Sequence, residues 1–161
     1  MPYRRILFIC HANTSRSIIA EALLKKMLVE HGLDQRYAIQ SGGIAPFARD
    51  GALVSLDARL VLRDEGIHLS AESVATDLKA NRHLISQADL ILAMTVEQIR
   101  MLHAGFPEAT GKEVHTLKAF AGGEGNIEDP AGRDEAVFEA CRDEIKACLE
   151  RAIERLALEE A

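Results

Sequence analysis

Cysteine and long apolar runs are both scarce in this chain of 161 residues. It has three cysteines and no tryptophan, and aromatic residues make up only 4%. An odd and low cysteine count argues against a disulfide framework and predicts a reducing, cytoplasmic location. The longest apolar runs, such as Ile6 to Cys10 and Leu90 to Met94, are far shorter than the roughly 20 residues that a membrane helix needs. No apolar signal-peptide core follows Arg4 and Arg5, so we expect no membrane association or export.

The chain also lacks an excess of basic over acidic residues. The chain carries 19 basic and 25 acidic residues, for a net charge of -6, and no cluster of Lys and Arg forms a nucleic-acid footprint. Five histidines are scattered without ligand spacing or paired carboxylates, which predicts neither a metal site nor a cofactor; they are His31, His68, His83, His103 and His115.

The composition is that of an ordinary globular protein. Apolar residues make up 48% and charged residues 27%. A chain of this length can bury one hydrophobic core, so we expect a single domain over residues 1–161 and, by its small size, a monomer.

Short apolar runs alternate with longer segments of helical periodicity, which predicts an α/β fold with a central four-stranded parallel sheet and helices on both faces, in three layers. The expected strands are Arg4 to Cys10, Tyr37 to Ser41, Asp89 to Met94 and Glu113 to Leu117. The expected helices run from about Arg16 to His31, Leu56 to Glu65, Asn81 to Gln87, Val96 to Phe106 and Asp134 to Leu156.

The connections carry their own signals. We expect a turn at Gly42-Gly43, a loop with a short helix over Leu69 to Lys79, and a glycine-rich loop from about Lys118 to Arg133. Ligands of such sheets bind at the carboxyl ends of the strands. Cys10 and Asp129 both fall on that edge.

The segment from Cys10 to Ser17 joins the first strand to the first helix and places an arginine six residues after a thiol. A loop of this length can wrap its backbone N–H groups around a phosphate at a helix N-terminus, while Arg16 offers a bidentate fork to two oxygens. The same field favours a thiolate at Cys10, which is then a nucleophile below the phosphorus. The candidate phosphate-binding residues are His11, Ala12, Asn13, Thr14, Ser15, Arg16 and Ser17.

The spacing of Cys10 and Arg16 alone could arise by chance. Its position between an apolar strand and an amphipathic helix, followed by a hydroxyl at Ser17 that can donate to the thiolate, favours a functional loop. Phosphoryl transfer also needs an acid that protonates the leaving group and then activates water. We assign that role to Asp129, whose neighbour Pro130 stiffens the turn. An isolated Asp-Pro pair would be an ordinary turn.

Together, the loop, the Ser41-Gly42-Gly43 segment, Asp129-Pro130 and the strand order resemble the low-molecular-weight protein tyrosine phosphatase family over nearly the whole chain. The resemblance implies a metal-independent hydrolase that dephosphorylates proteins through a cysteinyl-phosphate intermediate. It also implies that Asn13 braces the loop in a left-handed turn tied to Ser41, a conformation that asparagine tolerates well.

Within that family the chain is most similar to the bacterial branch that includes protein arginine phosphatases, through Thr14 and the run Thr116-Leu117-Lys118. A β-branched polar Thr14 would narrow the pocket against a planar phenol and help to position water. Ala131 stands where relatives usually carry an aromatic residue. We therefore place phosphoarginine slightly ahead of phosphotyrosine. Three further departures, each from a residue usual in the family, are Ala12 for glycine, Ser15 for cysteine and Ile18 for proline.

Several alternatives stay open. The side chain of His11 either tunes the charge of the loop or points to solvent. Cys141 and Cys148 lie on one helical face too far apart to pair, so we assign both to the core, which also argues against an arsenate reductase. The rival functions are a catalytically weak phosphate- or phosphoprotein-binding module and a phosphoryl carrier of the sugar-transport type, which has no use for Arg16.

Overall fold

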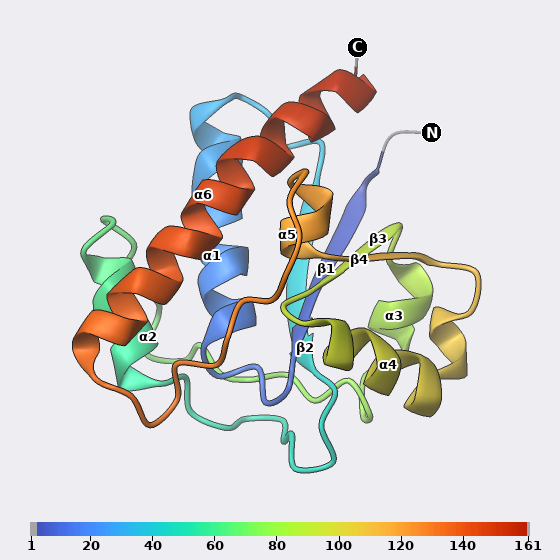
Figure 1. The fold of residues 1–161 in the computed structure, drawn as a ribbon, viewed down its shortest axis with the longest axis horizontal. Helices are drawn as coiled ribbons and strands as arrows, with labels where there is room; N and C mark the ends of the chain where they lie inside the picture. The colour runs from blue at the N-terminus through green and yellow to red at the C-terminus, as the bar shows by residue number, and fades with distance from the viewer. Residues whose placement is uncertain (1–2, 161) are drawn as a thin grey trace.

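Four parallel strands form the centre of the molecule (Figure 1). The computed structural model describes the backbone of residues 3–160 and the side chains of residues 3–157. The strands lie in the order β2-β1-β3-β4, where β1 is Arg5–Cys10, β2 is Ala38–Gly43, β3 is Leu90–Ala93 and β4 is Glu113–Thr116. All three pairings are parallel, which confirms the predicted sheet.

Helices cover both faces of this sheet, as predicted. One face carries α1 (Arg16–Glu30), α2 (Leu56–Arg63), the short α5 (Leu117–Phe120) and the long α6 (Glu135–Glu160), which packs against α1 and α2. Figure 1 shows α6 running the length of that side. The other face carries α3 (His83–Gln87), α4 (Val96–Gly105) and the 3₁₀ turn η1 (Pro107–Ala109). None of the helices within residues 3–160 has the length and apolar character needed to cross a membrane.

The central strand β1 divides the core into two clusters because its side chains alternate between the faces. Ile6, Phe8 and Cys10 face the cluster beneath α1 and α6, while Leu7 and Ile9 face the cluster beneath α3 and α4. Cys10 therefore ends β1 with its side chain on the α1 side, where the next helix begins.

Three sequence-based expectations about connections were wrong. Gly42 and Gly43 belong to β2 rather than to a turn, and Gly43 pairs with Cys10. Residues 69–79 form turns and isolated bridges without a helix, since Val74 pairs with Leu53 and Asp77 with Gly43. The fourth strand ends at Thr116, whose side chain accepts a hydrogen bond from the backbone of Ala119 and so begins α5 inside the expected loop.

Candidate active site

The loop from Cys10 to Arg16 joins the end of β1 to the start of α1 and is held in place by the segment that follows β2. The backbone N–H of Ile44 donates to the carbonyl of Cys10 at 3.0 Å, and that of Ala45 donates to the carbonyl of His11 at 3.0 Å. Further along, the N–H of Ser55 donates to the carbonyl of Thr14 at 2.9 Å. These three bonds fix the backbone of the loop against the segments that follow β2.

Asn13 braces the loop from within. It is the one non-glycine residue of the described chain with positive φ, at 62°. Its side-chain amide donates to Ser17 Oγ at 2.7 Å and Ser41 Oγ at 2.9 Å, and its Oδ1 accepts from the N–H of Thr76 at 2.8 Å. These bonds offset the cost of the left-handed backbone. Ala12 has no positive φ, so alanine is tolerated there without backbone strain.

The Cys10 sulfur accepts hydrogen bonds at the base of the loop. Cys10 is 3% exposed, and its Sγ lies 2.8 Å from Ser17 Oγ and 3.2 Å from the backbone N of Asn13. Because Ser17 Oγ already accepts from Asn13, its own proton can donate to sulfur. Two donors aimed at one sulfur stabilise a thiolate.

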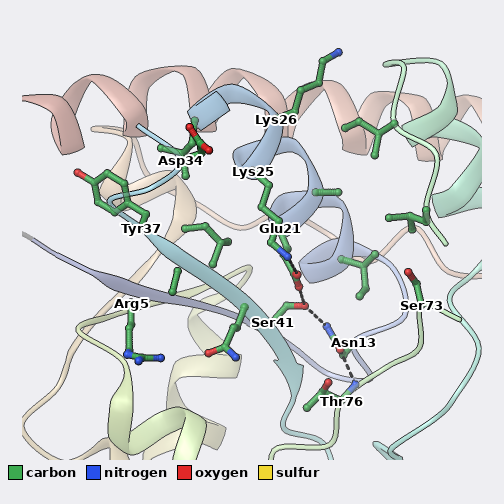
Figure 2. Close-up of a pocket in the computed structure, with 18 of the residues that line it drawn as sticks. Arg5, Asn13, Glu21, Lys25, Lys26, Asp34, Tyr37, Ser41, Ser73 and Thr76 are labelled. Atoms are coloured by element: carbon green, nitrogen blue, oxygen red, sulfur yellow. Dashed lines mark hydrogen bonds and ion pairs between the residues drawn. The ribbon is translucent and has the colours of Figure 1, made fainter. Parts of the chain in front are cut away.

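A series of hydrogen-bonded side chains extends from Asn13 away from the Cys10 sulfur. Ser41 accepts from Asn13 and donates to Glu21, which also pairs with Lys25 at 2.6 Å. Figure 2 shows the connected side chains of Asn13, Ser41 and Glu21, with Thr76 beside them. The carboxylate at Glu21 therefore fixes the hydroxyl direction of Ser41, which in turn leaves Ser41 Oγ as an acceptor for Asn13.

Arg16 is 3% exposed and connects the loop of residues 10–16, the candidate phosphate loop, to the loop that carries Asp129. Its NH1 donates to the carbonyl of Ile127 at 2.8 Å, and its NH2 lies 3.2 Å from His11 Nδ1 and 3.8 Å from Asp129 Oδ2. A guanidinium has more N–H groups than these contacts use, so the remainder can bind phosphoryl oxygens.

His11 points toward Arg16, which resolves the two alternatives for its side chain. Its Nδ1 lies 3.1 Å from Gln98 Nε2 as well as 3.2 Å from Arg16 NH2. Both neighbours are obligatory donors, so Nδ1 accepts and the ring proton lies on Nε2. We did not identify Gln98 from the sequence as a site residue. The spacing of Thr95 and Gln98 does match a capping box, and Gln98 Oε1 indeed accepts from the backbone of Thr95 at 3.3 Å.

Asp129 lies at the mouth of the site. Its side chain is 52% exposed, and its Oδ1 accepts from the N–H of Ala131 at 3.0 Å. The loop is anchored to the sheet at Ile127, whose N–H donates to the carbonyl of Met94 at 2.9 Å. The structure thus places the carboxyl group of Asp129 3.8 Å from the buried guanidinium of Arg16, which ends the loop that begins at Cys10. A carboxyl group at this edge can exchange protons with solvent and with a leaving group.

A segment outside the predicted set borders the phosphate loop. Residues 45–48 are held by Lys79, whose Nζ donates to the carbonyls of Ala45 at 2.7 Å and Ala48 at 3.1 Å. Phe47 on this segment is 65% exposed. An exposed aromatic side chain beside a phosphate loop is available for contact with a bound protein.

The two remaining thiols are structural. Cys141 and Cys148 both pack in the core beneath α6, as predicted. Burial raises the pKa of the Cys141 thiol to about 11, and burial likewise raises the pKa of Cys148. Among the side chains of residues 3–157, no group of three or more His, Cys, Asp or Glu could hold a metal ion.

Comparisons with known proteins agree with this geometry. The family model described as low molecular weight phosphotyrosine protein phosphatase matches residues 5–161. A protein-arginine-phosphatase of Geobacillus stearothermophilus is 38% identical over 99% of this chain and 100% of its own. A low molecular weight protein-tyrosine-phosphatase of Acinetobacter johnsonii is 32% identical over 92% of this chain and 95% of its own.

A solved structure extends the likeness to the fold. The YwlE arginine phosphatase, in a Cys-to-Ser mutant whose active-site serine is phosphorylated, has a TM-score of 0.85 and 30% identity, and the match covers 95% of each chain. The model match, the sequence relatives and the shared fold agree along nearly the whole chain. The chain belongs to the low molecular weight phosphotyrosine protein phosphatase family.

Proposed function

We propose that this protein hydrolyses phosphorylated arginine side chains of proteins in preference to phosphotyrosine, through a phosphocysteine at Cys10. The observation that carries the proposal is the pair of donors on the Cys10 sulfur, 2.8 and 3.2 Å away, within a loop that ends at the buried Arg16. A thiol serving only as core packing would need neither these donors nor a neighbouring guanidinium.

The reaction runs in two steps. The Cys10 thiolate attacks phosphorus, the bond from phosphorus to the leaving nitrogen or oxygen breaks, and the leaving group takes a proton from Asp129. The Asp129 carboxylate then accepts a proton from water, which attacks phosphorus, and the P–S bond breaks to release phosphate and the thiolate. Arg16 and the loop N–H groups stabilise the oxygens in both transition states. A relative with phosphoserine at its mutated active-site cysteine supports the first step.

The preference for phosphoarginine rests on the walls of the site. Residues 127–133 contain no aromatic side chain, and Ala131 offers little surface for stacking on a phenol ring. Glu128 and Asp129 are exposed on the same loop, where their carboxylates would attract the guanidino group of the substrate. Two relatives, 38% and 31% identical to this chain, are named protein-arginine-phosphatase.

The test is phosphate release from a phosphoarginyl peptide and a phosphotyrosyl peptide of matched sequence, with Cys10→Ser as the blank. We expect turnover of both by the wild type, faster on phosphoarginine, and no turnover by the variant. Faster hydrolysis of phosphotyrosine would reject the preference alone. Near wild-type activity of Cys10→Ser would reject the mechanism.

The rival functions make different predictions. A binding module would bind phosphopeptides without releasing phosphate, and a phosphoryl carrier would accumulate a stable phosphocysteine. The carboxyl group of Asp129, 3.8 Å from Arg16, favours hydrolysis over both, because neither rival needs an acid.

We further propose that the substrates are cytoplasmic phosphoproteins and that the protein is a monomer. The three cysteines are all free in the structure, which suits a reducing compartment where Cys10 stays reduced. Size-exclusion chromatography with light scattering tests the monomer, for which we expect a mass near 17.6 kDa.

A further inference from the structure

A groove of about 990 Å³ lies along the outer edge of β2. We call it the β2 groove. Its walls come from α1, β2 and residues 67–76, with Arg5 and Leu84 at one end, and Figure 2 shows its lining side chains. Asn13 and Ser41 border it, whereas Cys10, Arg16 and Asp129 do not. The β2 groove is therefore separate from the entrance used by the phosphoryl group.

The edge of β2 forms one wall of this groove, where Ile39 and Ser41 are 5% and 6% exposed. Within the described residues β1 is the only sheet neighbour of β2, and the bonds to β1 come from alternate residues, such as Ala38 N–H to the carbonyl of Arg4 at 2.8 Å. In a parallel ladder the residues between them point outward, here Ile39, Ser41 and Gly43. For Ile39 and Ser41, no residue of the described chain hydrogen-bonds to the outward N–H and C=O.

Of these three outward-pointing residues, only Gly43 hydrogen-bonds to another segment of the described chain. Gly43 donates to the carbonyl of Thr76 at 2.9 Å and accepts from the N–H of Leu78 at 2.9 Å. Just before Thr76 the chain turns away, and Ala75 pairs with Ala52 at 2.9 Å instead. The pairing of Gly43 with residues 76–78 shows how an extended segment can bind to the edge of β2. The same segment does not pair with Ile39 or Ser41.

The sides of the β2 groove suit an extended peptide with apolar and acidic side chains. Val29 and Val74 line it and are 62% and 43% exposed, although both are aliphatic. Arg5, Lys26 and Asp34 also line it, together with the ion pair of Glu21 and Lys25. No described carboxylate lies within ion-pair distance of Arg5 or Lys26, and Lys26 donates to the carbonyl of Glu65. Outside the pair of Glu21 and Lys25, the lining thus has two cations, Arg5 and Lys26, and one carboxylate, Asp34. In a protein with a net charge of -6, this local surplus of positive charge favours a negatively charged partner.

We propose that an extended, acidic segment of a partner protein binds in the β2 groove by adding a strand to the edge of β2. Its backbone pairs with the outward groups of Ile39 and Ser41, its apolar side chains lie between Val29 and Val74, and its carboxylates approach the cations. Backbone pairing supplies affinity, and the side chains supply selectivity. Because this surface is distinct from the entrance to Cys10, the bound segment leaves the reacting site open.

The first experiment selects a phage-displayed library of random dodecapeptides against the full-length Cys10→Ser protein in excess inorganic phosphate. The enriched peptides are synthesised, and their affinities are measured by fluorescence anisotropy. We expect acidic sequences with alternating apolar residues. Hydrogen exchange should show protection of the Ile39 and Ser41 amides when a peptide binds, and added phosphate should leave the affinity unchanged.

Two matched comparisons separate strand addition from general attraction. The backbone amides of the peptide are N-methylated at alternate residues. Methylation of the residues that pair with β2 should weaken binding at least tenfold, and methylation of the intervening residues should weaken it much less. Lys26→Glu should weaken binding several-fold, whereas Arg100→Glu, the same charge change on the exposed part of α4, should not. An empty selection, equal effects of both methylation phases, or equal effects of both substitutions would overturn the proposal.

Discussion

The guanidinium of Arg16 contacts His11, which is itself held by a side chain from another helix. Gln98, 0% exposed at the start of α4, lies 3.1 Å from His11, which accepts from Arg16 at 3.2 Å. Gln98 is thus a positioning residue, because it acts on the phosphate through two other side chains. Its amide also caps α4, so any test must separate the two roles.

Replacing Gln98 by alanine should lower kcat more than it raises KM. The lost bond frees His11 to rotate away from Arg16, and a hydrogen bond to a charged group contributes about 1.5–3 kcal/mol, which corresponds to a fall of about tenfold or more. Steady-state kinetics on the preferred phosphopeptide measures the effect. Thr95→Ala is the control, since it removes the same helix cap and keeps the contact to His11. An equal loss of kcat in that control would assign the effect to the helix.

Thr14 should control the choice between phosphoarginine and phosphotyrosine. Its side chain is half-buried in the loop, between the left-handed Asn13 and the buried Ser15. We expect Thr14→Ala to shift the ratio of kcat/KM values toward phosphotyrosine by about tenfold, because a wider pocket admits the planar ring. Thr14→Val keeps the width of the pocket and removes the hydroxyl, so it separates the two contributions of Thr14. A ratio unchanged in both variants would show that the preference arises elsewhere.

At the scale of elements, the end of β2 sets the position of the phosphate loop. A Cβ atom at Gly43 would lie 2.7 Å from the carbonyl oxygen of His11 and 2.8 Å from the carbonyl carbon of Ala12. Both are backbone atoms, so a side chain at this position would push the loop away from β2. The close approach of two backbones explains glycine here, where the sequence suggested a turn.

Gly43→Ala should therefore impair catalysis strongly while the fold remains. We expect kcat/KM to fall by about a hundredfold, since displacement of a reacting group by about 1 Å has that effect. Circular dichroism should show an intact fold. Gly105→Ala is the control, because its Cβ would meet open space at the end of α4 and should cost no activity. Near wild-type activity of Gly43→Ala would contradict this account of the loop.

For the whole molecule, the environments of the three thiols predict selective chemistry. Cys141 and Cys148 stay protonated at pH 8, because burial raises the pKa of Cys141 to about 11 and also raises that of Cys148. Iodoacetamide at pH 8 should alkylate Cys10 at least tenfold faster than either, since the thiolate is the reactive form. Peptide mass spectrometry follows the three rates. Inorganic phosphate should protect Cys10 alone, and fast labelling of Cys141 in the folded protein would contradict the prediction.

The sequence by itself determined the class of the protein and most of its architecture. The apolar runs and the residues that start and stop helices were enough to predict the parallel sheet with two helical layers, because both signals are local in the sequence. The spacing from Cys10 to Arg16 placed a thiol and a cation on one loop. The prediction of a cysteine-type protein phosphatase is confirmed by the family match over residues 5–161.

The tertiary structure decided what lies between segments distant in the chain. It placed Gln98 against His11, 87 residues away, and the carbonyl of Ile127 against Arg16, 111 residues away. It also showed that Gly43 serves close backbone approach, and that β2 is an edge strand with two open positions. Periodicity and spacing report which residues share one element, whereas strand order and backbone contacts depend on how all the elements pack together.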